Sequence, residues 1–114
     1  MEKNSFTSQD NRMLYKSNTL FIAKGLIEKF LILSKGIVVL ILPSDSKDSE
    51  NVYCYNFSGG LKWQISPSYQ LHTNNYYTSI YFSEDKLLQA FNINGIEVTL
   101  NEEDGSIIKK ELIK

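Results

Sequence analysis

The sequence contains a single cysteine, Cys54, so no disulfide can form within the chain. A lone thiol in an apolar run is typical of a protein kept in a reducing compartment. Residues 1–11 contain no apolar stretch of the kind that a secretory signal has. The most apolar segment, 30–42, is interrupted by Lys35 and Gly36 and is shorter than the roughly 20 residues of a membrane-spanning helix. We therefore expect a cytoplasmic protein with no membrane span.

An excess of charge of either sign is also missing. The 114 residues carry 12 Lys and Arg against 13 Asp and Glu, a formal charge of −1, and 42% of them are hydrophobic. Such a chain is neither disordered nor suited to holding nucleic acid by electrostatic attraction. At this length roughly two thirds of the surface of the unfolded chain can be buried. We expect one globular domain spanning 1–114.

The usual signatures of catalysis and of cofactor binding are absent as well. His72 is the one histidine, and the sequence has no nucleophile elbow, no paired metal-binding histidines, no Cys-x-x-Cys and no glycine-rich phosphate loop. The carboxylates of Glu84-Asp85 and of 102–104 fall in expected turns, where acidic residues mainly keep a loop solvated. We expect no enzymatic activity, no cofactor and no bound metal.

Alanine is scarce, whereas β-branched and aromatic residues are plentiful, and this bias favours strands over helices. Turn signals, of which Asn94-Gly95 and Asp104-Gly105 are the strongest, separate the apolar runs and predict hairpins. The runs predict eight strands, at 26–33, 36–42, 51–57, 61–66, 77–82, 87–93, 96–100 and 106–112.

We expect a mainly β fold with two antiparallel sheets of about four strands each. The first sheet covers 26–66, a connection covers 67–76, and the second sheet covers 77–114. The segment 1–25 is less regular, and we interpret it as an N-terminal arm. Within it, Thr19 to Ala23 is consistent with a further strand, and Ser8 to Tyr15 with a short helix or an arm.

An internal repeat relates the two expected sheets. The segment 51–59 aligns with 87–95, an offset of 36 residues, and both segments run from a strand into a glycine turn. This alignment pairs Asn56 with Asn92 and Cys54 with Ala90, and omitting Gly60 extends it to pair Trp63 with Val98. The minimum interpretation is two similar hairpins, at a spacing close to that of propeller blades.

The segment Asn51 to Ile65 resembles the blade hairpin of pyrroloquinoline-quinone-type and WD-repeat-type propellers, in which an aromatic strand enters an Asn-Gly turn and Trp ends the next strand. A propeller closes with at least four blades, and this chain has material for two, a half propeller. The Asn-Val-Tyr-Cys-Tyr and Trp-Gln-Ile pattern is similar to that of immunity proteins of bacterial contact-dependent growth inhibition systems. That resemblance implies a cytoplasmic protein that binds and neutralises a cognate toxin, some of these toxins being ribonuclease-like.

Alternation along the strands separates core from surface. Cys54 points away from Tyr53 and Tyr55, and we expect a buried, inert thiol. Trp63 shares a face with Leu61 and Ile65, which we expect to be the core. His72 lies in a polar connection, where a surface position is favoured over an interface role. Between Tyr53 and Tyr81 lie six of the seven tyrosines, and a core of this size does not need so many phenol hydroxyls, so we expect some at the surface, where tyrosine is typical of recognition sites.

Acidic residues gather in the 42–51 connection and in the turns of the second sheet. Ordinary solvated turns explain such groups equally well, but together with the tyrosines they indicate a surface for a basic protein partner. The residues expected to bind a toxin, by covering its active site, are Asp45, Asp48, Glu50, Tyr53, Tyr69, His72, Tyr76, Tyr77, Glu102, Glu103 and Asp104.

Two other functions remain open. The chain could be an assembly subunit that self-associates through open sheet edges, although we favour a monomer before binding. A small-ligand-binding module or hydrolase ranks third.

Overall fold

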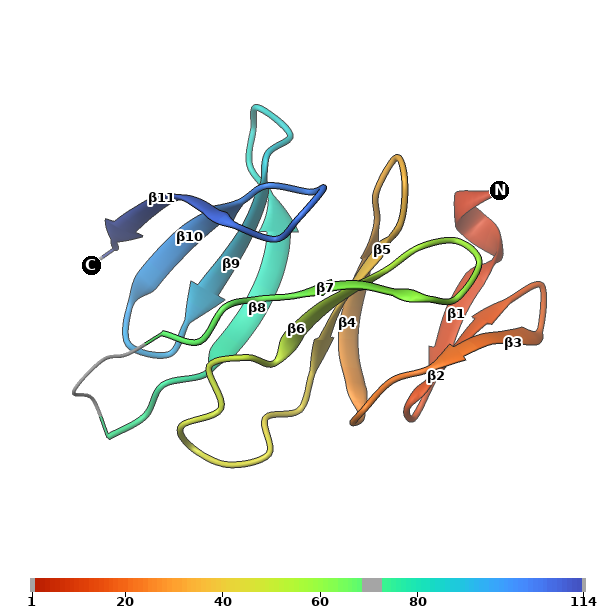
Figure 1. The fold of residues 1–114 in the computed structure, drawn as a ribbon, viewed down its shortest axis with the longest axis horizontal. Helices are drawn as coiled ribbons and strands as arrows, with labels where there is room; N and C mark the ends of the chain where they lie inside the picture. Colours follow the sequence, from red (N-terminus) through yellow and green to blue (C-terminus); the bar gives the residue numbers. More distant parts are fainter. Residues whose placement is uncertain (1, 69–72, 114) are drawn as a thin grey trace.

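The computed structural model describes residues 2–68 and 73–113 and consists of three antiparallel sheets that follow one another along the chain (Figure 1). A short 3-10 turn, η1 (Lys3–Ser5), precedes the first sheet. The first sheet contains β1 (Phe6–Gln9), β2 (Arg12–Tyr15) and β3 (Asn18–Ile22). The middle sheet contains β4 (Ile27–Ile32), β5 (Ile37–Ile41), β6 (Val52–Tyr55) and β7 (Leu61–Gln64). The last sheet contains β8 (Tyr77–Phe82), β9 (Leu88–Asn92), β10 (Ile96–Leu100) and β11 (Ile107–Leu112).

The mainly β prediction is confirmed, and all eight predicted strands form. Two of them, 77–82 and 96–100, have the predicted bounds. In each sheet the hydrogen-bonded neighbours are also neighbours in sequence, so every connection within a sheet is a hairpin. Among the described residues, no helix has the length and hydropathy needed to cross a membrane.

The N-terminal segment differs from the expected arm, because it forms a complete three-stranded sheet. The stretch Ser8 to Tyr15, interpreted as a helix or an arm, belongs to the hairpin β1–β2, whereas the expected strand at Thr19 to Ala23 is present as β3. The turns that create this sheet hold Asp10, Lys16 and Ser17 in the left-handed region, at φ of 55°, 50° and 69°. These turns contain no glycine, so the sequence lacked the usual hairpin signal.

The centre of the middle sheet is buried on both faces, since every residue of β5 and β6 is buried. Val38, Val52 and Cys54 pack with the last sheet in one hydrophobic core. The alternate residues of the same strands, such as Val39 and Tyr53, pack with the first sheet in a second core. Successive side chains of a strand point to opposite faces, so one apolar run supplies both the core with the first sheet and the core with the last sheet.

The predicted repeat is visible in the strand register. Cys54 pairs with Trp63 across the β6–β7 hairpin, and Ala90 pairs with Val98 across β9–β10, as the alignment requires. The first hairpin occupies the third and fourth positions of its sheet, whereas the second occupies the second and third positions of its own. The duplicated unit is therefore a hairpin and not a whole blade.

Trp63 lies in the core as expected, 6% exposed, but Leu61 on the same strand is 50% exposed. A register shift between Cys54 and Tyr55 opposite β7 breaks the alternation at this point. The Trp63 indole donates to the carbonyl of Glu102 at 2.8 Å, and its ring covers Gly105, where a side chain would collide with it. The turn between β10 and β11 is thereby attached to the middle sheet.

Asn51 joins the middle and last sheets through a fully buried side-chain amide. Its Nδ2 donates to the carbonyls of Ile41 at 3.0 Å and of Tyr77 at 2.9 Å. Its Oδ1 accepts the N–H of Tyr77 at 3.0 Å. The side chain thus bonds to β8 as a neighbouring strand would, and it fixes where β8 begins relative to the end of β5.

Replacing Asn51 with aspartate tests this joint, because Asn51→Asp keeps the size of the side chain while removing both N–H donors and adding a charge at a fully buried position. We expect a loss of about 2 to 4 kcal/mol of unfolding free energy, measured by urea denaturation. Asn74→Asp, at an exposed position, is the matched control and should change stability little. Equal effects of the two substitutions would contradict the assigned role.

Cys54 provides a second test of the core. Its side chain is completely buried, and burial raises the pKa of the thiol from 9.0 to about 11. We expect thiol reagents at pH 8 to label Cys54 only after unfolding in urea. Because the thiol ionises at lower pH in the unfolded chain, its contribution to stability is complete below pH 9.0 and is lost as the pH rises through about 11. Rapid labelling of the native protein would show that the middle sheet opens.

Candidate functional site

The acidic residues expected at the site lie at two opposite ends of the sheets. The turn 101–105 lies beside the middle sheet's 33–36 turn, since Glu103 approaches Lys35 at 3.8 Å. The connection 42–51 links the other ends of β5 and β6 and lies along the opposite side of the molecule (Figure 1). The single acidic patch that would unite these groups is therefore not formed.

Two carboxylates of the 101–105 turn, those of Glu103 and Asp104, have partners nearby. Glu103 also approaches Lys62 at 3.3 Å, so two lysines balance its charge. Asp104 accepts the backbone N–H of Ser106 at 2.9 Å, and this hydrogen bond lowers the pKa of the Asp104 carboxyl. These groups shape and neutralise a turn.

The 42–51 connection owes its shape to two aspartates. Asp45 accepts the N–H of Lys47 at 2.8 Å, and Asp48 accepts the N–H groups of Ser44 at 3.0 Å and of Glu50 at 3.1 Å. Such side-chain-to-backbone bonds hold a loop without regular secondary structure. Among the described residues none forms an ion pair or hydrogen bond with the carboxylate of Glu50, which leaves this charge free for a partner.

Asp48, Glu50 and Tyr53 converge on a pocket of about 480 Å³, which we call the Asp48 pocket. Its apolar wall includes Leu26 and Leu42, which are 50% and 51% exposed. The other lining residues are Lys24, Gly25, Ile41, Pro43, Ser44 and Gln64. The pocket therefore combines exposed apolar surface with two carboxylates.

Tyr53 is the fixed element of the pocket. Gln64 donates from Nε2 to the Tyr53 hydroxyl and to the carbonyl of Glu50, both at 3.0 Å. The pKa of Tyr53 is raised, chiefly by burial and further by the negative charges of Asp48 and Glu50. Its ring also attracts a cation, because Lys24 Nζ lies 5.8 Å from the ring centroid.

The remaining predicted residues do not join this pocket. Tyr77 is 2% exposed and belongs to the core between the middle and last sheets, so its side chain is not part of a surface. Tyr76 is half-buried. Tyr69 and His72 lie outside the described residues. The expected surplus of surface tyrosine fails for Tyr53 and Tyr55 as well, since the first sheet covers both of them and Tyr55 stacks on Phe21 at 3.8 Å.

Four pocket residues were missed by sequence reasoning: Leu26, Leu42, Gln64 and Lys24. Leu26 and Leu42 are predicted ends of strands, and only the chain directions after β3 and β5 make them a wall of the pocket. Gln64 alternates with Trp63, which could have indicated an outward-facing polar residue next to Tyr53. Lys24 offered no signal, because its place depends on the unpredicted first sheet.

The arrangement suits the binding of a positively charged group. Within residues 2–68 and 73–113, no group of three or more His, Cys, Asp or Glu side chains is placed to hold a metal ion. The polar groups that line the pocket are two carboxylates, a phenol, an amide, a hydroxyl and an ammonium.

No curated protein matches this chain. One family model covers residues 4–112, which is nearly the whole sequence and includes all three sheets. The chain therefore belongs to the family described as domain of unknown function DUF7957.

Proposed function

We propose that this protein is a non-catalytic binding module that captures a basic protein through the Asp48 pocket. The observation that carries the proposal is the convergence of Asp48, Glu50 and Tyr53, three residues of the expected binding set, on one pocket with an exposed apolar wall. Of that set, Asp45 lies on the same connection and belongs to the proposed surface. Glu102, Glu103, Asp104 and Tyr77 do not.

A lysine or arginine side chain of the partner fits the chemistry of the pocket. Its aliphatic stem can pack against Leu26 and Leu42, while its charged head approaches the carboxylates of Asp48 and Glu50. The ammonium of Lys24 already lies 5.8 Å from the centroid of the Tyr53 ring, so a partner's cation takes its place there only if Lys24 turns away. The unpaired charge of Glu50 adds attraction at long range and so increases the rate of association.

The partner class comes from the resemblance to immunity proteins of contact-dependent growth inhibition systems. On this proposal the partner is a cognate toxin, plausibly a basic ribonuclease-like domain whose own site must attract phosphate. Capture at the Asp48 pocket would cover that cationic site and stop the toxin in the cytoplasm. Inhibition then requires one protein for each toxin molecule.

The test is coexpression with a candidate toxin domain, followed by growth rescue and measurement of the dissociation constant. Glu50→Gln should weaken binding about fivefold to tenfold, mostly through slower association at low salt, because it removes a charge that supports no described contact. Glu84→Gln removes an exposed charge from the turn between β8 and β9 and is the matched control. Rescue without binding, or equal affinities for the two variants, would refute capture at this pocket.

Self-association is the second candidate, and the outer strand of the last sheet favours it. β11 has one unpaired edge, and its Ile108 and Leu112 side chains are 64% and 60% exposed. Unpaired edges with apolar side chains invite the addition of another strand. In this alternative the chain is a structural subunit that assembles through β11.

Analytical ultracentrifugation over a wide concentration range separates the two functions. We expect a monomer, because Lys109, Lys110 and Glu111 are exposed charges on β11, and charges on an edge strand oppose pairing with a second copy. A concentration-dependent dimer that Ile108→Lys dissociates, with Glu50→Gln as a variant that leaves it intact, would instead support assembly.

A further inference from the structure

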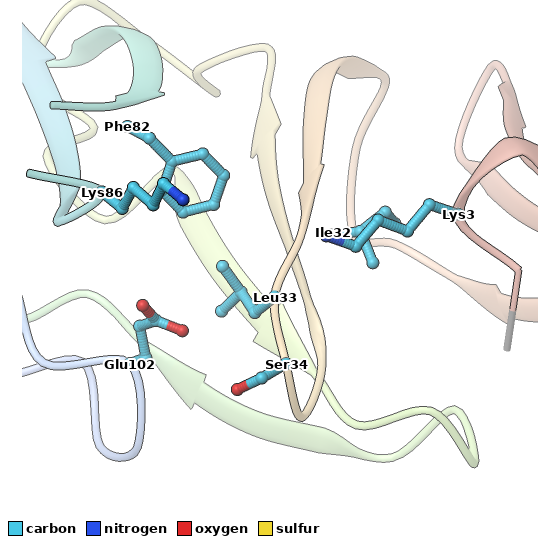
Figure 2. A pocket seen from close by; sticks show the side chains of 7 residues that line it. All are labelled: Lys3, Ile32, Leu33, Ser34, Phe82, Lys86 and Glu102. Carbon is cyan, nitrogen blue, oxygen red and sulfur yellow. The ribbon is translucent and has the colours of Figure 1, made fainter. Parts of the chain in front are cut away.

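A second hollow lies at the end of the sheets opposite the Asp48 pocket, and we call it the Lys86 cleft. It has a volume of about 480 Å³ and is lined by Lys3, Ile32, Leu33, Ser34, Phe82, Lys86 and Glu102. Figure 2 shows Lys3 and Lys86 reaching in from opposite sides, with Leu33 between them. No residue of this hollow takes part in the proposed capture of a basic protein.

The lining of the Lys86 cleft comes from segments next to the first, middle and last sheets. Lys3 lies in η1 ahead of β1, Ile32 ends β4, and Phe82 ends β8, whereas Glu102 comes from the turn between β10 and β11. β4 and β8 are in direct contact. The cleft is therefore a product of the whole stack, and it depends on the same packing as the core.

Lys86 has a left-handed backbone at a turn position that glycine occupies in two similar turns. The turns 56–59, 92–95 and 83–86 are alike, since in each the N–H of the last residue donates to the carbonyl of the first, at 2.8 to 3.0 Å. The last residue is left-handed in all three, at φ of 96° for Gly59, 88° for Gly95 and 63° for Lys86. Glycine adopts this conformation freely, whereas lysine is strained in it.

The strained lysine lies at the cleft, while the two glycine turns do not line it. Side chains held in an unfavourable backbone conformation are typical of ligand sites, where the position of the side chain matters more than local stability. The cleft also carries two ammonium groups against one carboxylate, that of Glu102. A ligand with a negative charge is thus the electrostatic complement.

We propose that the Lys86 cleft binds a small organic acid. The apolar body of the acid lies on Ile32, Leu33 and Phe82, its carboxylate pairs with the ammonium of Lys86, and Lys3 adds positive potential from the other side. The volume is within the usual range of small-molecule sites, and an apolar floor with a few polar groups is their usual composition. The Ser34 hydroxyl supplies a further hydrogen-bond donor at the rim.

The test is a titration of the isotope-labelled protein with hydrocinnamate, followed by amide chemical shifts. We expect saturable binding in the millimolar range or tighter, with shifts concentrated in 32–34, 82–87 and at Glu102. The neutral amide of the same acid should bind about tenfold more weakly, because it lacks the charge that pairs with Lys86. Equal affinity for acid and amide, or shifts centred elsewhere, would overturn the proposal.

Lys86→Gly provides the decisive variant. It should preserve or raise the melting temperature, because glycine relieves the left-handed strain, and it should weaken hydrocinnamate binding about tenfold. Lys16→Gly is the matched control, since Lys16 is also a left-handed lysine, with φ of 50°, but lies outside the cleft. Unchanged affinity in Lys86→Gly would refute the assignment, whereas Glu50→Gln should leave the acid bound as before, which keeps this result separate from the capture of a basic protein.

Discussion

The buried amide of Asn51 is the interaction on which the arrangement of the sheets depends. Two antiparallel sheets packed face to face can slide along one another, because apolar contacts have little direction. The three hydrogen bonds of Asn51 remove that freedom, since they join the carbonyl of Ile41 to both backbone groups of Tyr77. The 42–51 connection, which ends at Asn51, is fixed by the same bonds. The same hydrogen bonds therefore position both the core and the connection that lines the Asp48 pocket.

Trp63 complements Asn51 at the other end of the interface. Its indole N–H and its ring together hold the turn 101–105, which brings Glu102 to the rim of the Lys86 cleft. One polar side chain at each end fastens the interface, and within the described residues no buried side-chain nitrogen or oxygen lacks a partner. Directional bonds at two ends fix a register that hydrophobic packing alone would leave loose.

The eight strands of the middle and last sheets could be predicted because the turns between them are rich in Asn, Asp and Gly, although the turn 83–86 has Lys86 where its counterparts have glycine. The first sheet could not be predicted, because its turns place Asp10 and Lys16 in the left-handed region without a glycine that would indicate a hairpin. Because the first sheet was not predicted, nothing in the sequence indicated that Tyr53 and Tyr55 are covered. Asp48 and Glu50 were found because their loop is evident from composition, whereas Lys24 depends on contacts between sheets that no local pattern records.

The Asp48 pocket and the Lys86 cleft lie at opposite ends of the stack, and this follows from the parity of antiparallel strands. Consecutive connections of the middle sheet alternate between its two ends, so the 42–51 connection cannot lie beside the turn 33–36. A strand of about five residues extends roughly 17 Å, which is about twice the Debye length at physiological salt. The carboxylates of the Asp48 pocket and the lysines of the Lys86 cleft are therefore largely screened from one another. A basic protein can be attracted to one end without competing with an anion held at the other, so the two sites can act independently on one small scaffold.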